Sequence, residues 1–231
     1  MRRRRKSRTK PGLGGSNWAG RHSEFIKAAI IVFIIGLVLR IFVFSPLKVE
    51  NVYMEDTFQP GDFVLVSQLA YKFVNPQPGD IVVFEHPFQV GQNRIGRVIA
   101  IAGQTIQVIG KEVYIDNQPY ADTPKQKHTD SRLIPVDYSN RDFVDPVQVP
   151  AGAVYILCDN RDQAEDSRNF GTVNIDNIKG KGLFVYWSWK PDPGAPEWES
   201  PYIIPAIQIL FYNLFHFPTR IGWDRLGAAA D

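Results

Sequence analysis

The sequence predicts a mainly β protein: an antiparallel β-barrel or sandwich-like domain preceded by an N-terminal transmembrane helix. Short runs rich in Val, Ile and Phe recur between residues 62 and 189, and several follow Gly-Asp turns. No long segment with helical periodicity interrupts them. One continuous apolar segment, residues 25–44, precedes these runs and is close to the length of about 20 residues that crosses a bilayer.

Residues 1–24 form a basic segment that we expect to be a cytoplasmic tail. They carry eight Arg or Lys and one acid, Glu24, so their net charge is +7; because the whole chain is +2, the remainder is −5. Cations ahead of a span hold the N-terminus in the cytoplasm. A nucleic-acid-binding protein would need a basic folded surface, and the acidic balance of the remainder argues against one. We therefore expect no nucleic-acid partner.

Residues 25–44 are interpreted as a single transmembrane helix. Lys27 and Arg40 lie near its ends, where long side chains can reach the interface. A buried core helix is one alternative, but the segment has no polar face. A cleavable signal peptide is another, but residues 45–47 do not resemble a cleavage site between small residues. We expect a single-pass protein of the cytoplasmic (inner) membrane, in contact with the lipid bilayer, with residues 46–231 on the extracytoplasmic or periplasmic side.

Seven strands are predicted in the domain that starts at residue 46. They are the segments 62–67, 80–84, 97–101, 105–110, 113–118, 154–157 and 182–189. β-Branched and aromatic residues dominate these segments, and turn residues bound them. Residues 119–150 are polar with little apolar periodicity, and we expect them to form an insertion.

Residues 202–217 form an apolar C-terminal element that follows a Pro-rich stretch. At 16 residues the element is short for a span, and Pro205 fits the first turn of a helix. A packed amphipathic helix or a membrane-surface helix is therefore preferred to a second crossing. The single cysteine, Cys158, cannot form an internal disulfide, and we expect it to be buried.

Three motifs resemble those of the bacterial type I signal peptidases (leader peptidases, family S26). Residues 46–62 resemble the nucleophile loop, and residues 96–99 resemble the tract that carries the general base. Residues 158–171 resemble a late signature block in which seven positions match at fixed spacing. The matching residues are Met54, Thr57, Gly61 and Asp62 in the loop, Arg97 in the second tract, and Asp159, Asn160, Arg161, Asp166, Ser167, Arg168 and Gly171 in the block.

The resemblance implies the signal-peptidase fold and a serine endopeptidase that removes signal peptides from exported proteins with a Ser/Lys pair. This chain departs from the family at both members of that pair: Tyr53 occupies the nucleophile position and Gly96 the general-base position. Asn51 aligns with the oxyanion-side Ser, and Ala164 with the Ser that orients the Lys. A phenol, with a pKa of about 10, carries its oxygen farther from the backbone than serine does, and glycine supplies no base.

The resemblance also assigns a substrate groove and a structural frame. The groove residues are Leu47, Lys48, Val49, Glu50, Asn93, Arg94 and Ile95, from two strands that an extended peptide can pair with by β-augmentation. The structural residues are Arg97, Asp159, Asn160, Arg161, Asp166, Ser167 and Arg168. Among them we expect Asp166 and Arg168 to form a buried ion-pair network that holds the fold together near Arg97.

Three functions remain open at this point. The first is a catalytically inactive pseudoenzyme that binds signal peptides or assists an active signal peptidase. The second is an active serine-type signal peptidase that uses relocated residues, for which Ser45, Ser67 and Cys158 are the candidates. The third is a structural membrane partner without peptide binding. The sequence has no metal-ligand motif, phosphate-binding loop or dinucleotide fingerprint, so neither a metal nor another cofactor is expected.

Overall fold

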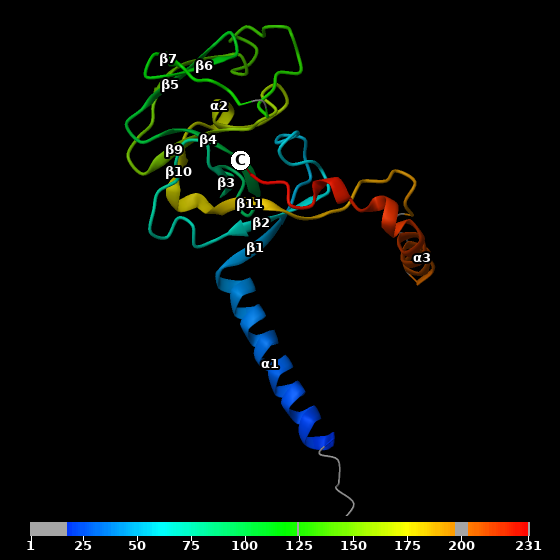
Figure 1. The fold of residues 1–231 in the computed structure, drawn as a ribbon. Helices are drawn as coiled ribbons and strands as arrows, with labels where there is room; N and C mark the ends of the chain where they lie inside the picture. The colour runs from blue at the N-terminus through cyan, green and yellow to red at the C-terminus, as the bar shows by residue number, and fades with distance from the viewer. Residues whose placement is uncertain (1–17, 124, 197–202, 231) are drawn as a thin grey trace, which may run out of the picture. The chain divides into compact units, whose positions relative to one another are not determined.

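A computed structural model describes residues 18–123, 125–196 and 203–230 (Figure 1). The chain divides into two units, residues 1–40 and residues 41–231, which are described separately. Most of the predicted basic tail, residues 1–17, lies outside the described residues.

The first unit contains most of one helix, α1 (Trp18–Phe42). Among the described residues, one helical segment, Glu24–Phe42, is long and apolar enough to cross a membrane, and its side chains are exposed. The predicted span ran to residue 44, whereas the helix ends at Phe42 and Phe44 already opens a strand. The earlier end has a local cause, since Ser45 precedes Pro46 and a residue before proline avoids the helical region.

The second unit is built on two β-sheets, and every ladder in the described part is antiparallel. The larger sheet has the order β1 (Phe44–Lys48), β2 (Asp62–Ser67), β11 (Ile178–Ser188), β3 (Ile81–Glu85), β4 (Asn93–Ile101), β9 (Ala153–Leu157) and β10 (Val173–Asn174). The smaller sheet has the order β7 (Gln118–Pro119), β6 (Glu112–Ile115), β5 (Thr105–Ile109) and β8 (Phe143–Gln148). The predicted mainly antiparallel β class is confirmed.

The Gly-Asp turns begin strands where the sequence placed them. Gly61 and Gly79 have φ values of 95° and 93°, in the left-handed region that glycine adopts at little cost. A Cβ at Gly61 would lie 2.1 Å from the carbonyl oxygen of Trp189, so a larger residue does not fit there. The turns therefore fix the starts of β2 and β3.

Strand β8 lies inside the segment that the sequence marked as an insertion, residues 119–150. It pairs with β5 and completes the smaller sheet, so the last part of the segment belongs to the β framework. Its side chains are exposed or half-buried, and Pro146 interrupts its apolar run. The sequence of β8 therefore lacks the alternation of apolar and polar residues that indicates a strand.

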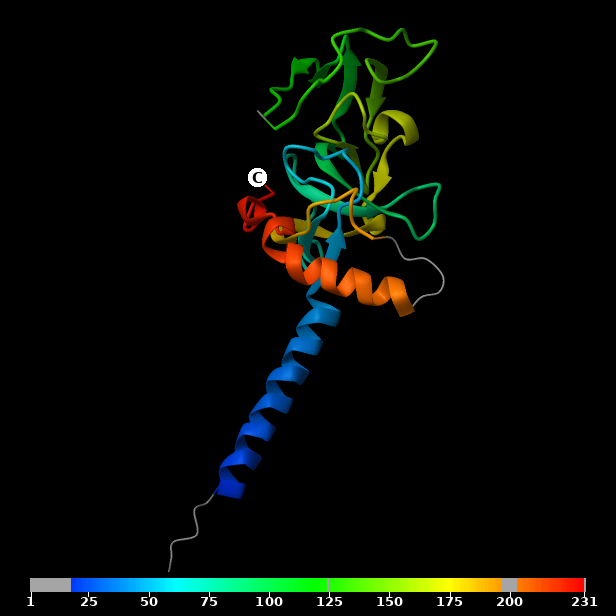
Figure 2. The same ribbon diagram turned by 90° about the vertical axis from the view of Figure 1, so that its right-hand side faces the viewer.

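One buried cluster joins the loop after β1 to the centre of the larger sheet. It contains Met54 and Phe58 from the loop, Val64 from β2, Ile95 from β4 and Cys158. Two strands separate β2 from β4 in the sheet order, so the sheet must curl for their side chains to share one cluster (Figure 2). This curl creates the concave region described below.

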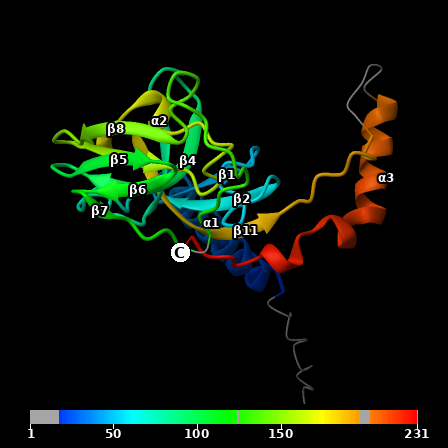
Figure 3. The same cartoon turned by 90° about the horizontal axis from the view of Figure 1, so that it is seen from above.

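The C-terminal part consists of α3 (Ile203–Arg220) and a short 3₁₀ helix, η2 (Trp223–Arg225). The predicted element 202–217 lies within α3 apart from Tyr202, which lies outside the described residues, and the helix continues three residues beyond the predicted end, to Arg220. The chain then returns to β11, where Ala229 bridges to Phe184. Figure 3 shows α3 beside the sheets and not across a sheet face.

Candidate functional site

A groove of about 400 Å³ lies between the segments that contain β1 and the start of β4. It is lined by Leu47, Lys48, Val49, Glu50 and Asn51 on one side and by Gln92, Asn93, Arg94 and Ile95 on the other. β1 is an edge strand, so one row of its backbone N–H and C=O groups has no strand partner. Four antiparallel pairings connect β1 to β4, so the two strands run in the same direction. This geometry suits an extended peptide laid between them.

Tyr53 lies in the loop that follows β1. Its backbone N–H donates to Oδ1 of Asn51 at 3.2 Å, and its carbonyl accepts from the Asn160 N–H at 2.9 Å. Its side chain is partly buried against the cluster that contains Cys158. The Asn51 oxygen is therefore committed to the loop backbone, and only the amide N–H groups remain as donors at the expected oxyanion position.

The loop that contains Tyr53 has a backbone conformation at Asp56 that the residue of the family motif could not adopt. Asp56 stands where the motif has proline, and its φ is 80°. A proline ring holds φ near about −65°, so proline cannot adopt this conformation. Lys127 holds the segment from outside, with its ammonium 3.0 Å from Oδ2 of Asp56 and 3.3 Å from Oε2 of Glu55.

Neighbouring side chains fill the space beside Gly96, the expected general-base position. A Cβ at Gly96 would lie 2.6 Å from Cγ2 of Ile156 and 3.6 Å from Sγ of Cys158. Real Cβ atoms do not approach other carbon atoms to 2.6 Å, so Ile156 must shift before any larger residue fits. The motif has glycine where this chain has Cys158, so the lost lysine accompanies a gain of volume nearby.

Cys158 is buried and belongs to the core. Its thiol lies 3.5 Å from the carbonyl oxygen of Ile95, and burial raises the pKa of this thiol well above its usual value. A buried thiol with a raised pKa is a poor nucleophile. The expectation of a buried cysteine agrees with this environment.

Ala164 lies close to Tyr53. Both line a small pocket of about 180 Å³, and both pack against the cluster beneath the loop. The other residues of this pocket are Ser139, Arg141, Asp162, Gln163, Glu165, Arg168 and Asn169. The structure therefore brings together Tyr53, the expected nucleophile position, and Ala164, the position expected to orient the base, which has no hydroxyl.

Arg94 connects the groove to Tyr53. Its guanidinium carbon lies 5.6 Å from the centre of the Tyr53 ring, and Nη2 lies 3.4 Å from Oε2 of Glu165. The other carboxylate oxygen of Glu165 lies 3.7 Å from Nε2 of His86, which is buried. Neither His86 nor Glu165 was selected from the sequence, because His86 lies outside the three motifs and Glu165 is not a matching position of the 158–171 block.

A buried ion pair ties the loop to the sheet. Arg97 donates from Nε to Oδ1 of Asp159 and from Nη2 to Oδ2, both at 2.9 Å. The two side chains are 3% and 0% exposed. Thr57 of the loop adds a hydrogen bond from Oγ1 to Oδ2 of Asp159 at 2.5 Å. Bidentate geometry of this kind fixes position as well as charge.

A second ion pair holds the signature block itself. Arg168 donates from Nε to Oδ1 of Asp166 at 2.9 Å and from Nη2 to the Arg161 carbonyl at 2.6 Å. Asp166 caps α2 (Ser167–Phe170) by accepting from the Arg168 N–H, and Oγ of Ser167 accepts from the Ile156 N–H at 3.0 Å. These contacts position β9, which carries Ile156 and ends one residue before Cys158.

Two further residues of the block contact other segments of the domain. Asn160 donates from Nδ2 to the Val52 carbonyl at 3.2 Å, so it supports the loop directly. Arg161 is buried and donates to Oδ1 of Asp122 at 2.8 Å, and burial lowers the pKa of its guanidinium. Together these contacts join the loop, the block and the segment around Asp122.

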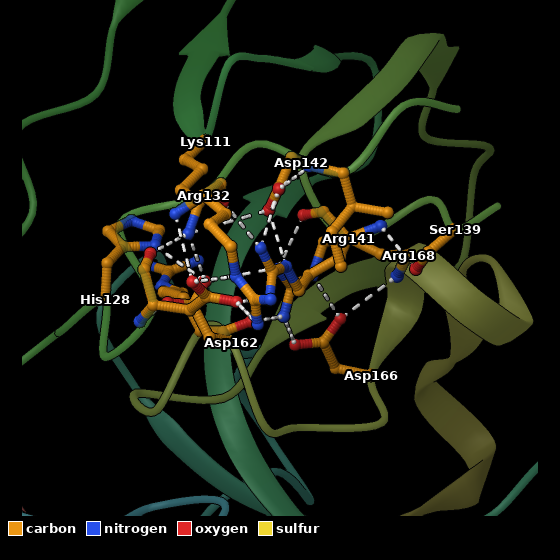
Figure 4. Close-up of polar contacts among 12 residues, drawn as sticks. Lys111, His128, Arg132, Ser139, Arg141, Asp142, Asp162, Asp166 and Arg168 are labelled. Atoms are coloured by element: carbon orange, nitrogen blue, oxygen red, sulfur yellow. Dashed lines mark hydrogen bonds and ion pairs between the residues drawn. The ribbon is translucent and has the colours of Figure 1, made fainter. Parts of the chain in front are cut away.

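The charged network of Figure 4 extends from this block to the segment between β7 and β8. Asp162 is its centre: it accepts from the Asp130 N–H at 2.7 Å and lies 2.9 Å from Lys111 and 3.2 Å from His128. Burial alone would raise the pKa of Asp162, but these hydrogen bonds and the Lys111 charge outweigh it and lower the pKa to about 2. Arg141 closes the network through Asp142 and Asp130.

Within the described residues, no group of three or more His, Cys, Asp or Glu side chains is arranged to hold a metal ion. The acidic residues of the network are instead paired with Lys and Arg side chains.

Known proteins resemble this chain over most of its length. The family described as "Signal peptidase, peptidase S26" matches residues 22–187. The protein named "Probable signal peptidase I-1" of Synechocystis is 34% identical over 171 residues, which cover 71% of this chain and 82% of that protein. Signal peptidase I of Bacillus caldolyticus is 35% identical over 156 residues, which cover 66% of this chain and 84% of that protein.

Two other similarities are more partial. Thylakoidal processing peptidase 1 of Arabidopsis thaliana is 29% identical over 188 residues, and this chain spans 52% of its length. The crystal structure of a signal peptidase I from Enterococcus faecalis has a TM-score of 0.34 and 23% identity, covering 46% of this chain and 95% of that one. The family match exceeds half of the chain and agrees with the curated relatives, so the chain belongs to the signal peptidase family, peptidase S26.

Proposed function

We propose that this protein is a non-cleaving, peptide-binding member of the signal peptidase family, anchored by α1 with its β domain on the outer face of the membrane. The observation that carries the proposal is the state of the two catalytic positions. Tyr53 has replaced the nucleophile, and the space beside Gly96 is filled by Ile156 and Cys158. A Ser/Lys mechanism needs a small hydroxyl nucleophile and a neutral amine beside it, and neither group is present at these positions.

The groove supports the binding half of the proposal. Its two walls keep a free strand edge and a parallel partner segment, which are the features that β-augmentation uses. The buried pairs Arg97–Asp159 and Asp166–Arg168 hold both walls in place without any catalytic group. The ligands would be extended segments of exported proteins, signal peptides among them, and the bound protein would either present them to an active signal peptidase or sequester them.

Relocated catalytic residues find less support. Ser67 ends β2 five residues from Asp62, which is about 16 Å along an extended strand. Ser45 pairs with Val66 and therefore lies at the same far end. Cys158 is buried. Neither serine therefore lies at the end of the groove next to Tyr53, and the thiol of Cys158, although near this end, is not accessible to a substrate.

Processing and binding assays on the full-length protein in detergent test the two halves separately. A preprotein should remain uncut after incubation, while a synthetic signal peptide should bind saturably. Asn93→Trp, at an exposed position on the groove wall, should weaken binding; Val90→Trp, on the same β3–β4 hairpin and 92% exposed but outside the groove lining, should not. Efficient cleavage would overturn the inactive assignment. Absence of binding at millimolar peptide would favour a structural membrane partner.

The membrane sidedness needs its own test. The +7 charge of residues 1–24 places the N-terminus in the cytoplasm by the charge rule. Protease added to intact spheroplasts should therefore digest the β domain. Protection of the domain in intact spheroplasts, followed by digestion after lysis, would reverse the proposed orientation.

A further inference from the structure

Helix α3 has its apolar side facing solvent. Ile207, Leu210, Phe211, Leu214 and Phe215 are all exposed, with fractions between 51% and 76%. Their spacing of three, four, seven and eight residues places them on one side of the helix. The helix lies outside residues 22–187, the part that matches the family, so its role does not follow from family membership.

The side of α3 opposite this stripe faces the rest of the domain and carries Tyr212, Asn213 and Arg220, and Phe217 packs against Trp187 and Trp189 near the end of the helix. The Tyr212 hydroxyl donates to Oδ2 of Asp192 at 2.6 Å. Arg220 donates to Oδ1 of Asn213 at 2.6 Å, and its guanidinium carbon lies 4.7 Å from the ring centre of Trp189. A helix of a water-soluble domain buries its apolar side and exposes its polar side. In α3 the apolar stripe is instead exposed.

Aromatic residues surround the C-terminal end of α3. Trp187 and Trp189 stack with ring centres 6.4 Å apart, and Phe217 contacts both rings. Trp223 is 60% exposed, and its indole N–H donates to the carbonyl of Pro218. Trp residues with a bonded N–H and an exposed ring are typical of membrane–water interfaces.

The chain itself indicates what covers the exposed stripe. The apolar segment Glu24–Phe42 ends two residues before β1 begins at Phe44. A bilayer that holds this segment therefore lies close to the first strand of the domain. Once this segment is inserted, any second membrane contact of the domain forms within the same molecule, at a high effective concentration. The residues of α3 include no Asp or Glu, and its single Lys or Arg, Arg220, lies in its last turn. Among the described residues, α3 is not one of the helices that are long and apolar enough to cross a membrane. A position in the membrane–water interface fits its length and its exposed apolar stripe.

We propose that α3 is a second membrane contact, lying in the plane of the bilayer interface with the stripe Ile207, Leu210, Phe211, Leu214 and Phe215 among the acyl chains. The stripe enters the lipid, and the side that carries Tyr212, Asn213 and Arg220 faces the protein and the headgroups. Two contacts, α1 and α3, then restrict the orientation of the groove relative to the membrane.

An environment-sensitive fluorophore at single engineered cysteines tests this proposal in the full-length chain. Cys158 is buried, so the unmodified chain serves as the unlabelled control. Leu214→Cys places the probe on the stripe; His216→Cys places it at an exposed position on the opposite side of the same helix. Both proteins are reconstituted in phosphatidylcholine–phosphatidylglycerol vesicles containing lipids with a quencher on the acyl chain.

We expect quenching at position 214 to be at least about two-fold greater than at position 216, with a blue-shifted emission at 214 only. Equal, strong quenching at both positions would indicate a second crossing and overturn the proposal. Absence of lipid quenching at 214 would also overturn it, whether the probe is accessible to an aqueous quencher or shielded by a protein or second copy. If Leu214→Cys does not fold, Leu210→Cys gives the same comparison.

Discussion

The Cγ2 methyl of Ile156 occupies the space that a Cβ at position 96 would need, 2.6 Å from its ideal location. The packing around position 96 therefore requires a glycine, so more than the loss of a lysine separates this position from the family motif. Reversion at this one position would force β4 and β9 apart or push Ile156 into a strained rotamer.

Gly96→Ala should therefore destabilise the protein by about 1–3 kcal/mol, the usual cost of overpacking a core. Gly182→Ala is the matched control: it also lies inside a strand, but its Cβ would meet its nearest neighbour at 3.4 Å, an ordinary contact. Urea unfolding of the two variants in detergent, followed by tryptophan fluorescence, measures the difference. Equal midpoints for both would show that Ile156 yields easily.

Restoring the catalytic pair alone should give little activity. In Tyr53→Ser/Gly96→Lys, the new lysine meets Ile156 and Cys158 and finds no hydroxyl at Ala164 to orient it. Adding Ile156→Ala, Cys158→Gly and Ala164→Ser should raise cleavage of a signal peptide, since catalytic pairs depend on the groups that position them. The five-fold variant with Ala at position 53 is the control for contaminating peptidase. High activity in the two-residue variant would contradict the closed-site interpretation.

The Arg97–Asp159 pair should be among the costliest to break. Asp159→Asn removes the buried carboxylate that accepts two hydrogen bonds from the Arg97 guanidinium, and losses of this kind are about 3–5 kcal/mol. Arg132 pairs with Asp130 at the surface and is 84% exposed, so Arg132→Ala should cost less than about 1 kcal/mol. The two urea midpoints provide the comparison, and similar losses in both would refute the distinction.

Acid should weaken the network around Asp162. Its pKa is about 2 in the folded protein against a reference of 3.8, so the carboxylate stabilises the fold fully above about pH 4. This contribution, about 2 kcal/mol, is lost as the pH falls toward 2, because protonation then favours the unfolded chain. Asp162→Asn should lower stability at pH 7 and flatten the acid limb. An unchanged acid limb would assign the pH dependence to other carboxylates.

Much of the fold was predictable because its signals are local. The glycines before Asp62 and Asp80 and the β-branched runs after them lie within a few residues of one another, so β2 and β3 follow from the sequence. β8 did not, since its pairing with β5 spans more than 30 residues and its own pattern is weak. The end of α1 was predicted two residues late because the apolar composition continues past the helix.

For the substituted positions of the site, the sequence predicted which residues occupy them but not what surrounds them. The motif placed Tyr53, Gly96 and Ala164, but nothing in the sequence relates Gly96 to Ile156, which is 60 residues away. The same limit applies to α3: periodicity predicts an amphipathic helix, and only tertiary contacts such as Tyr212–Asp192 reveal which side faces outward. Long-range contacts set both features, and a local pattern does not contain them.

Because β1 begins two residues after α1 ends, the chain between the apolar segment and the groove is short. Leu47, which lines the groove, follows the last residue of the apolar segment by five positions, or at most about 17 Å of extended chain. A ligand that carries its own membrane-spanning segment can enter the groove only with residues that emerge at a similar height. Under the proposed function, the length of the α1–β1 junction would therefore limit which part of a membrane-bound peptide reaches the groove. Residues inserted after Val43 should change that part and leave the groove residues unaltered.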